Sequence, residues 1–223
     1  MTHASNAPAP LGASKIRKMA LQMVVGAIVG AAVTFAVLTF VGKSRFDLGD
    51  PARVIALCVG LVFALIGLCV ALGVLAPKPG AHLLNVEDEE ELREQRGQLG
   101  RAALVMLALG GAVLVLALAR VGGSPGLFSV QVAAMAAAAC VVVAGVFGFA
   151  GRNDQDELMR SVSREAMTWA MYALTILLGI WGAAAHLGFA RWISPLGLIN
   201  ALLIVQLVAI FAVSAKRGLL RPR

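Results

Sequence analysis

Charged residues and cysteines are both scarce in this sequence. Lys, Arg, Asp and Glu make up 14% of the 223 residues, whereas 60% of the residues are hydrophobic. A chain with so little polar surface cannot hide its apolar side chains in one soluble core, so lipid must cover most of them. The three cysteines lie inside apolar runs, and their spacing fits neither a disulfide framework nor a paired metal motif. The composition therefore excludes a soluble globular domain and a disulfide-bonded scaffold.

Several signatures of catalysis and ligand binding are also missing. The chain has no Walker loop, no H-E-x-x-H pair, no C-x-x-C and no C-x-x-C-H haem attachment. No Asp, Glu or Lys lies at a clear mid-membrane depth, where proton-coupled transporters and voltage sensors place ionisable groups. The basic residues behind the net charge of +7 lie at helix ends instead of forming a dense patch, which disfavours a nucleic-acid partner. We expect no enzymatic activity, no catalytic residues, no metal site and no cofactor.

The sequence does contain six long apolar runs. Each has about 20 or more residues, which is enough to cross about 30 Å of hydrocarbon as a helix. The predicted helices lie at residues 19–41, 53–76, 101–121, 126–150, 167–189 and 195–215. We expect disorder in residues 1–14, a transmembrane domain in 15–217 and a basic tail in 218–223. The sequence predicts an all-α polytopic membrane protein whose six transmembrane helices are arranged as three tandem helical hairpins.

The three turns inside these hairpins share one chemistry. They read Asp50-Pro51, Ser124-Pro125 and Ser194-Pro195, which is a helix N-cap followed by proline at the first helical position. The second and third turns also share an Ala-Arg pair before the cap, which indicates an internal repeat. Residues 122–126 match the G-x-S-x-G pattern of a hydrolase nucleophile. Because an aspartate stands in the corresponding place of the first turn, we interpret these serines as caps.

Lysine and arginine are distributed unevenly between the two sides of this topology. Fourteen lie on the side that holds both termini and the segments between hairpins, and five lie on the other side. By the positive-inside rule, both termini are cytoplasmic and the protein is a multi-pass protein of the cell (inner) membrane. The acidic segment 87–94 and residues 156–160 lie on the same side. We interpret both as helical extensions with acidic residues near the helix start.

Small residues form a stripe along the second predicted helix. The stripe consists of Ala56, Gly60, Ala64, Gly67 and Ala71. These positions fall within an arc of roughly 80°, and such a groove lets another helix approach closely in lipid. Gly26 and Gly30 form a GxxxG pair on the first predicted helix. We expect these two helices to pack on each other, and the alternative is oligomerisation through the same surface.

A sparse polar set remains in the outer half of the predicted bundle. It consists of His186, Asn200, Ser129 and Gln131. In the repeat alignment an apolar residue, Val115, stands opposite His186, so His186 is the member that most indicates a specialised role. We hypothesise that the four residues form a ligand-binding pocket that opens outward between the second and third hairpins. The alternative is that each side chain makes its own separate hydrogen bond, since unpaired polar groups are costly in lipid.

The expected function is that of a structural or accessory component of the membrane. Its partners are the lipid bilayer and either a second copy of the chain or another membrane protein. The alternative function is a small transporter or permease-like protein that uses the polar set. An intramembrane enzyme ranks third.

Overall fold

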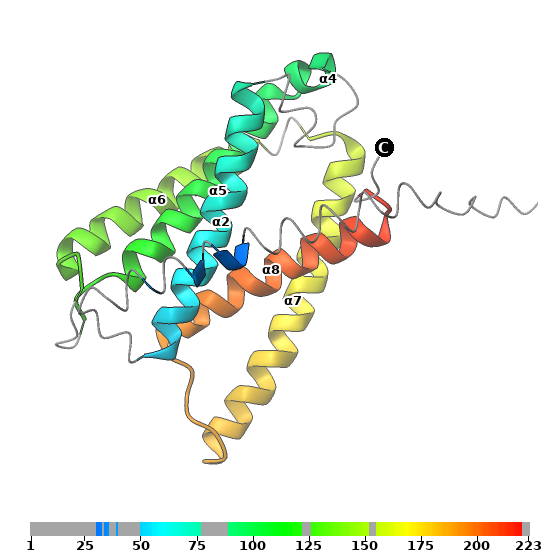
Figure 1. Cartoon of the computed structure of the whole chain (residues 1–223). Coiled ribbons are helices and arrows are strands. Elements are labelled where there is room, and N and C mark those ends of the chain that lie inside the picture. Colours follow the sequence, from blue (N-terminus) through cyan, green and yellow to red (C-terminus); the bar gives the residue numbers. More distant parts are fainter. Residues whose placement is uncertain are drawn as a thin grey trace, which may run out of the picture.

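The computed structural model of the protein describes residues 30–32, 34–35, 39, 50–76, 89–121, 126–151 and 155–219. These residues are overwhelmingly helical and contain no β-strand (Figure 1). The labelled helices are α2 (Pro51–Leu75), α4 (Glu89–Glu94), α5 (Arg96–Ala117), α6 (Val130–Ala150), α7 (Glu157–His186) and α8 (Pro195–Lys216).

Five of these helices, all except α4, are long and apolar enough to cross a membrane. The prediction of an all-helical, membrane-compatible protein is confirmed. The predicted helix 19–41 is described at only a few positions, all of them helical. The predicted disordered segment 1–14 and Gly26 lie outside the described residues.

Helices α2, α6, α7 and α8 begin after side-chain caps. The Asp50 carboxylate accepts a hydrogen bond from the Ala52 backbone N–H at 2.9 Å, and the Ser194 hydroxyl accepts one from Gly197 at 3.0 Å. Both are followed by proline in the first turn, so the predicted caps of α2 and α8 are confirmed. At α7 the Asp156 carboxylate accepts from the Met159 N–H at 2.7 Å. That cap lets α7 begin at Glu157, well before the apolar run expected from residue 167.

The start of α6 differs from the expectation. The sequence predicts a helix from residue 126, directly after Ser124-Pro125, whereas α6 begins at Val130. Ser129 is the N-cap: its backbone is extended (φ −64°, ψ 156°) and its hydroxyl accepts from the Val132 N–H at 3.4 Å. Gly126 lies instead in the returning loop, where a Cβ atom would stand 2.7 Å from the backbone of Ala119. This close approach requires glycine at position 126. The predicted cap of this helix, Ser124, lies outside the described residues.

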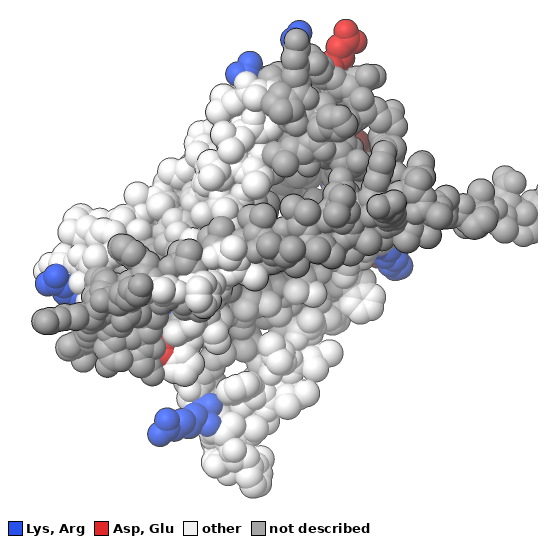
Figure 2. All heavy atoms as spheres, in the orientation of Figure 1, with Lys and Arg blue, Asp and Glu red and all other residues white. Residues whose placement is uncertain are grey.

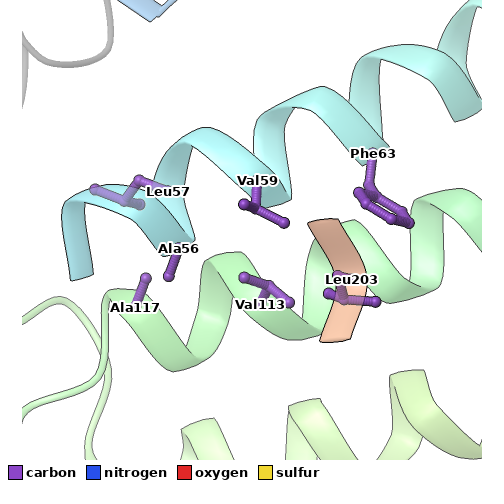
Figure 3. Close-up of a cluster of buried hydrophobic side chains, with 7 residues drawn as sticks. All are labelled: Ala56, Leu57, Val59, Phe63, Val113, Ala117 and Leu203. Atoms are coloured by element: carbon purple, nitrogen blue, oxygen red, sulfur yellow. The ribbon is translucent and has the colours of Figure 1, made fainter. Parts of the chain in front are cut away.

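The helices contact one another in the order α6, α5, α2, α8, α7. Figure 1 shows α2 passing between α5 and α8, with α7 crossing α8 on the far side from α5. The main core cluster is shared by α2, α5 and α8, and Figure 3 shows its side chains pointing toward one another. Its members are Ala56, Leu57, Val59, Phe63, Val113, Ala117 and Leu203. A smaller cluster of Val162, Ala166 and Val213 joins α7 to α8.

The outer surface of the helices is apolar along most of its length. Large side chains such as Met171, Ile180 and Val142 are 67%, 67% and 63% exposed. On the face in Figure 2, the coloured charged side chains lie toward the ends of the molecule, and the described surface visible between them is uncharged. An exposed apolar surface of this extent requires lipid or a protein partner to cover it.

Candidate functional site

The four polar residues predicted to form a pocket have different surroundings. Asn200 is buried, 2% exposed, and its side-chain amide donates to the backbone carbonyl of Ala52 at 2.9 Å. Ser129 is exposed and caps α6. Gln131 is exposed in the first turn of α6, and His186 is exposed at the end of α7. One of the four therefore joins two helices, one caps a helix, and two lie on the surface.

The structure does not bring these four residues together. Helix α6, which carries Ser129 and Gln131, packs on α5, whereas α8, which carries Asn200, packs on α7 and α2. In Figure 1 the beginning of α6 and the end of α7 lie on opposite sides of the beginnings of α2 and α8. Three hollows on the described surface are lined by other side chains.

A buried arginine, which the sequence argument treated as a topology signal, joins α2 to the end of α5. Arg53 is 8% exposed, its Nε donates to the carbonyl oxygen of Ala117 at 3.1 Å, and its terminal nitrogen donates to the carbonyl of Ala119. The last carbonyls of a helix have no partner within the helix and carry its negative dipole end. A guanidinium therefore donates the hydrogen bonds that these carbonyls lack, and its positive charge balances the partial negative charge at this end of α5. The sequence contained a signal for the burial of Arg53. This residue lies three positions before Ala56, on the same side of the helix as the small-residue stripe.

Arg53 and Asn200 together fasten three helices at one end of the bundle. Arg53 of α2 holds the end of α5, and Asn200 of α8 holds the first turn of α2. The Asn200 Oδ1 atom is buried and has no hydrogen-bond partner among the described residues. Both contacts are hydrogen bonds from side chains to backbone carbonyls, and each joins one helix to the next.

The small-residue stripe of α2 lies against α5. A Cβ atom added at Gly60 would stand 2.7 Å from the Leu114 side chain, and one at Gly67 would stand 2.9 Å from the carbonyl oxygen of Ala103. A Cβ atom on Gly110 of α5 would stand 2.7 Å from backbone atoms of α2. Helix α5 is thus a neighbour of the stripe. The packing of the helix at 19–41 on the same stripe stays a prediction, because most of that helix lies outside the described residues. Gly30 has no described atom within 4 Å of an added Cβ.

A basic hollow of about 600 Å³ lies between the start of α7 and the end of α8. Its lining residues are Glu157, Arg160, Ser161, Arg164, Glu165, Thr168, Trp169 and Arg217. The Glu165 carboxylate accepts hydrogen bonds from Arg217 at 2.6 Å and Lys216 at 3.1 Å. These bonds, that of Arg217 first, lower the pKa of the Glu165 carboxyl, which precedes the apolar part of α7. In the sequence these basic residues are interpreted as topology signals, and no motif there marks the hollow that they form.

Known proteins provide no template for this arrangement. No protein-family model, curated protein or solved structure matches the chain. Among the described residues, no group of three or more His, Cys, Asp or Glu side chains is arranged to hold a metal ion. The function is therefore argued from the contacts and charges of the chain itself.

Proposed function

We propose that this chain is a multi-pass membrane protein without enzymatic activity that serves as a structural or accessory component of the cell membrane. Six transmembrane helices in three hairpins, with both termini in the cytoplasm, are part of the proposal. The observation that carries it is the α2–α5 interface. Glycines on both helices meet the facing backbone at distances that leave no room for a methyl group. Close backbone packing at small residues is how helices associate in lipid. A tightly packed pair of helices of this kind supports a structural role.

The polar side chains inside the bundle support the same proposal. Arg53 and Asn200, the buried polar residues of the described core, are both hydrogen-bonded to backbone carbonyls of neighbouring helices. A transporter needs polar groups that face a water-filled path and exchange partners with a substrate. A pair already engaged in holding helices together fits a structural role better. The polar set of the transporter alternative does not line the basic hollow between α7 and α8 or the two apolar grooves beside α7.

The surface left outside the bundle agrees with an accessory role. Helix α7 contacts α8, but much of its apolar side is exposed, including Met171, Ile176 and Ile180 at 67%, 61% and 67%. Lipid can cover this surface, and so can a second copy or another membrane protein. If the protein is an accessory component, a protein partner covers at least part of this exposed apolar surface.

Site-specific photocrosslinking in intact cells tests this proposal. A benzoylphenylalanine at Ile180, on the exposed side of α7, is expected to give one discrete product heavier than the chain. The same group at Phe63, which is 4% exposed in the core, is the matched control and is expected to give no intermolecular product. Lipid adducts as the sole products at Ile180 and at Met171 would contradict the accessory role. Stoichiometric labelling of a serine by a fluorophosphonate would contradict the absence of enzymatic activity.

A further inference from the structure

The basic hollow between α7 and α8 carries more positive than negative charge. Arg160, Arg164 and Thr168 are spaced by four residues along one side of α7, and Arg217 faces them from the end of α8. Of the two carboxylates that line the hollow, Glu165 is paired with Lys216 and Arg217. Arg160 donates to the backbone carbonyl of Gln155, a neutral acceptor, at 3.2 Å. The hollow therefore has cationic hydrogen-bond donors that its own carboxylates do not neutralise.

An apolar groove of about 490 Å³ continues from this hollow along the same pair of helices. Trp169 lines both spaces, and Lys216 at the end of the groove is adjacent in sequence to Arg217 of the hollow. The rest of the groove is made by Ala173 of α7 and by Ile204, Val205, Val208, Ala209, Ala212 and Val213 of α8. A charged space therefore passes into an apolar space at an indole ring, the side chain that prefers the membrane–water interface.

We propose that this composite site binds one anionic phospholipid. Arg160 and Arg164 donate to the phosphate oxygens, Ser161 offers a hydroxyl beside them, and an acyl chain lies in the groove past Trp169. Arginine suits this task because its planar fork matches two phosphate oxygens at once. The hollow opens at the end of the helices that the lysine and arginine distribution assigns to the cytoplasm, where anionic lipids are concentrated.

An anionic lipid is favoured over a zwitterionic lipid by the charge count. Arg160, Arg164, Arg217 and Lys216 surround the two spaces, against Glu157 and Glu165. A choline or ethanolamine headgroup would bring a further positive charge into a site that already has an excess of positive charge. A glycerol headgroup is neutral and would not. The proposal depends on membrane insertion with this end in the cytoplasmic leaflet. It does not depend on the absence of enzymatic activity, so either proposal can fail while the other holds.

Fluorescence quenching of Trp169 by brominated lipid tests the site. The chain has three tryptophans, and Trp181→Phe with Trp192→Phe leaves Trp169 as the sole reporter. The full chain is reconstituted in phosphatidylcholine vesicles that contain a fixed fraction of phosphatidylglycerol, with bromine on the acyl chains of one lipid or the other. We expect brominated phosphatidylglycerol to quench Trp169 more strongly than its mole fraction explains. The expected preference is roughly fivefold for each arginine that contacts the phosphate.

Paired variants separate the site from general surface charge. Arg160→Gln with Arg164→Gln is expected to bring the preference down to less than about twofold, while leaving the Glu165 ion pairs intact. The matched control is Arg93→Gln with Arg96→Gln. These arginines are exposed on α4 and α5, on the same predicted side of the membrane, and do not line the hollow. The control is expected to retain the preference. Arg160→Lys with Arg164→Lys keeps the charge and is expected to retain most of it.

Four results would overturn the proposal. Equal quenching by the two brominated lipids in the parent protein would show that the site does not select anionic lipid. An unchanged preference in the glutamine pair would place the lipid elsewhere. Equal losses in the lysine and glutamine pairs would contradict a charge-based site. Displacement of the lipid by soluble glycerol phosphate at millimolar concentration would show that the hollow binds a free phosphate ester instead.

Discussion

A single methyl group at Gly110 is expected to force α2 and α5 apart. The added Cβ atom would stand 2.7 Å from the Ala64 amide nitrogen and 2.7 Å from the Gly60 carbonyl oxygen. Both atoms belong to helical backbone, which cannot rotate away as a side chain can. At Gly67 the nearest backbone atoms, on Ala103 and Leu107, are 2.9 Å away. At Gly60 the closest atom belongs to a leucine side chain, 2.7 Å away, which can move more easily.

The expected magnitude follows from two opposing effects. Overpacking in a close-packed interior destabilises by about 1–3 kcal/mol, and backbone contacts favour the upper part of that range. Replacing glycine by alanine inside a helix returns up to about 1 kcal/mol through helix propensity. We therefore expect Gly110→Ala to lower the free energy of unfolding by about 2 kcal/mol. Gly67→Ala should have a similar effect, and Gly60→Ala an effect nearer 1 kcal/mol.

Alanine substitutions on α6 are the matched controls. Gly145 and Gly148 are also helical glycines, but an added Cβ atom on either has no heavy atom within 4 Å in the described part of the chain. There we expect stability to be unchanged or raised by up to about 1 kcal/mol. The measurement is unfolding of the purified chain in mixed detergent micelles as the fraction of dodecyl sulfate rises, followed by circular dichroism. Equal stability of Gly110→Ala and Gly148→Ala would refute close packing between α2 and α5.

Three further predictions concern the helix ends. Arg53→Leu should lower the free energy of unfolding by about 2–5 kcal/mol, because two buried carbonyls lose charged donors, and a thermal melt in which it equals the parent would contradict this. A single cysteine at Glu89, in a chain without its native cysteines, should resist an impermeant maleimide added to intact cells, and labelling from outside would reverse the topology. Ser194→Ala should lower the free energy of unfolding by about 0.5–2 kcal/mol, whereas Ser194→Asp should be tolerated, and the same order should hold at Ser129. Equal stability of the Ala and Asp variants in dodecyl sulfate titrations would show that neither hydroxyl caps its helix.

The positions of the apolar helices could be predicted because run length decides them. A stretch of about 20 apolar residues leaves few alternatives to a membrane helix. The ends of the helices depend on competition between nearby caps, and sequence alone does not rank the competitors. Ser124 with its proline was the stronger motif, yet Ser129 caps α6 because the loop returns past Ala119 first. At α7, the cap at Asp156 begins the helix in the charged segment 156–160. Its charge pattern predicted this helical extension, which hydropathy does not register.

Contacts between helices were harder to predict than the helices themselves. The stripe around Gly60 and Gly67 specifies a close approach but does not identify the approaching helix. The partner, α5, presents Gly110 at the facing position, within a series of small buried residues (Ala103, Gly110 and Ala117) that the sequence analysis did not single out. The four polar residues of the predicted pocket lie on helices with different neighbours for a related reason. Similar depth in the membrane brings two residues together only if their helices are neighbours, and α6 contacts α5, whereas α8 contacts α2 and α7.

The arginines near the membrane boundary differ in whether their charge is used in contacts within the protein. Arg53 is buried and donates to the last carbonyl of α5 and to the carbonyl of Ala119 just after the helix, so its charge is used within the fold. Arg217 neutralises Glu165, so it is also partly used within the protein. Arg160 and Arg164 differ because they line an open hollow in which the neighbouring Glu165 already has cationic partners. A basic side chain with available donors beside an apolar groove needs an anion with an apolar tail. Within a bilayer, an anion with an apolar tail is a phospholipid, and these two arginines are the residues proposed to bind its phosphate.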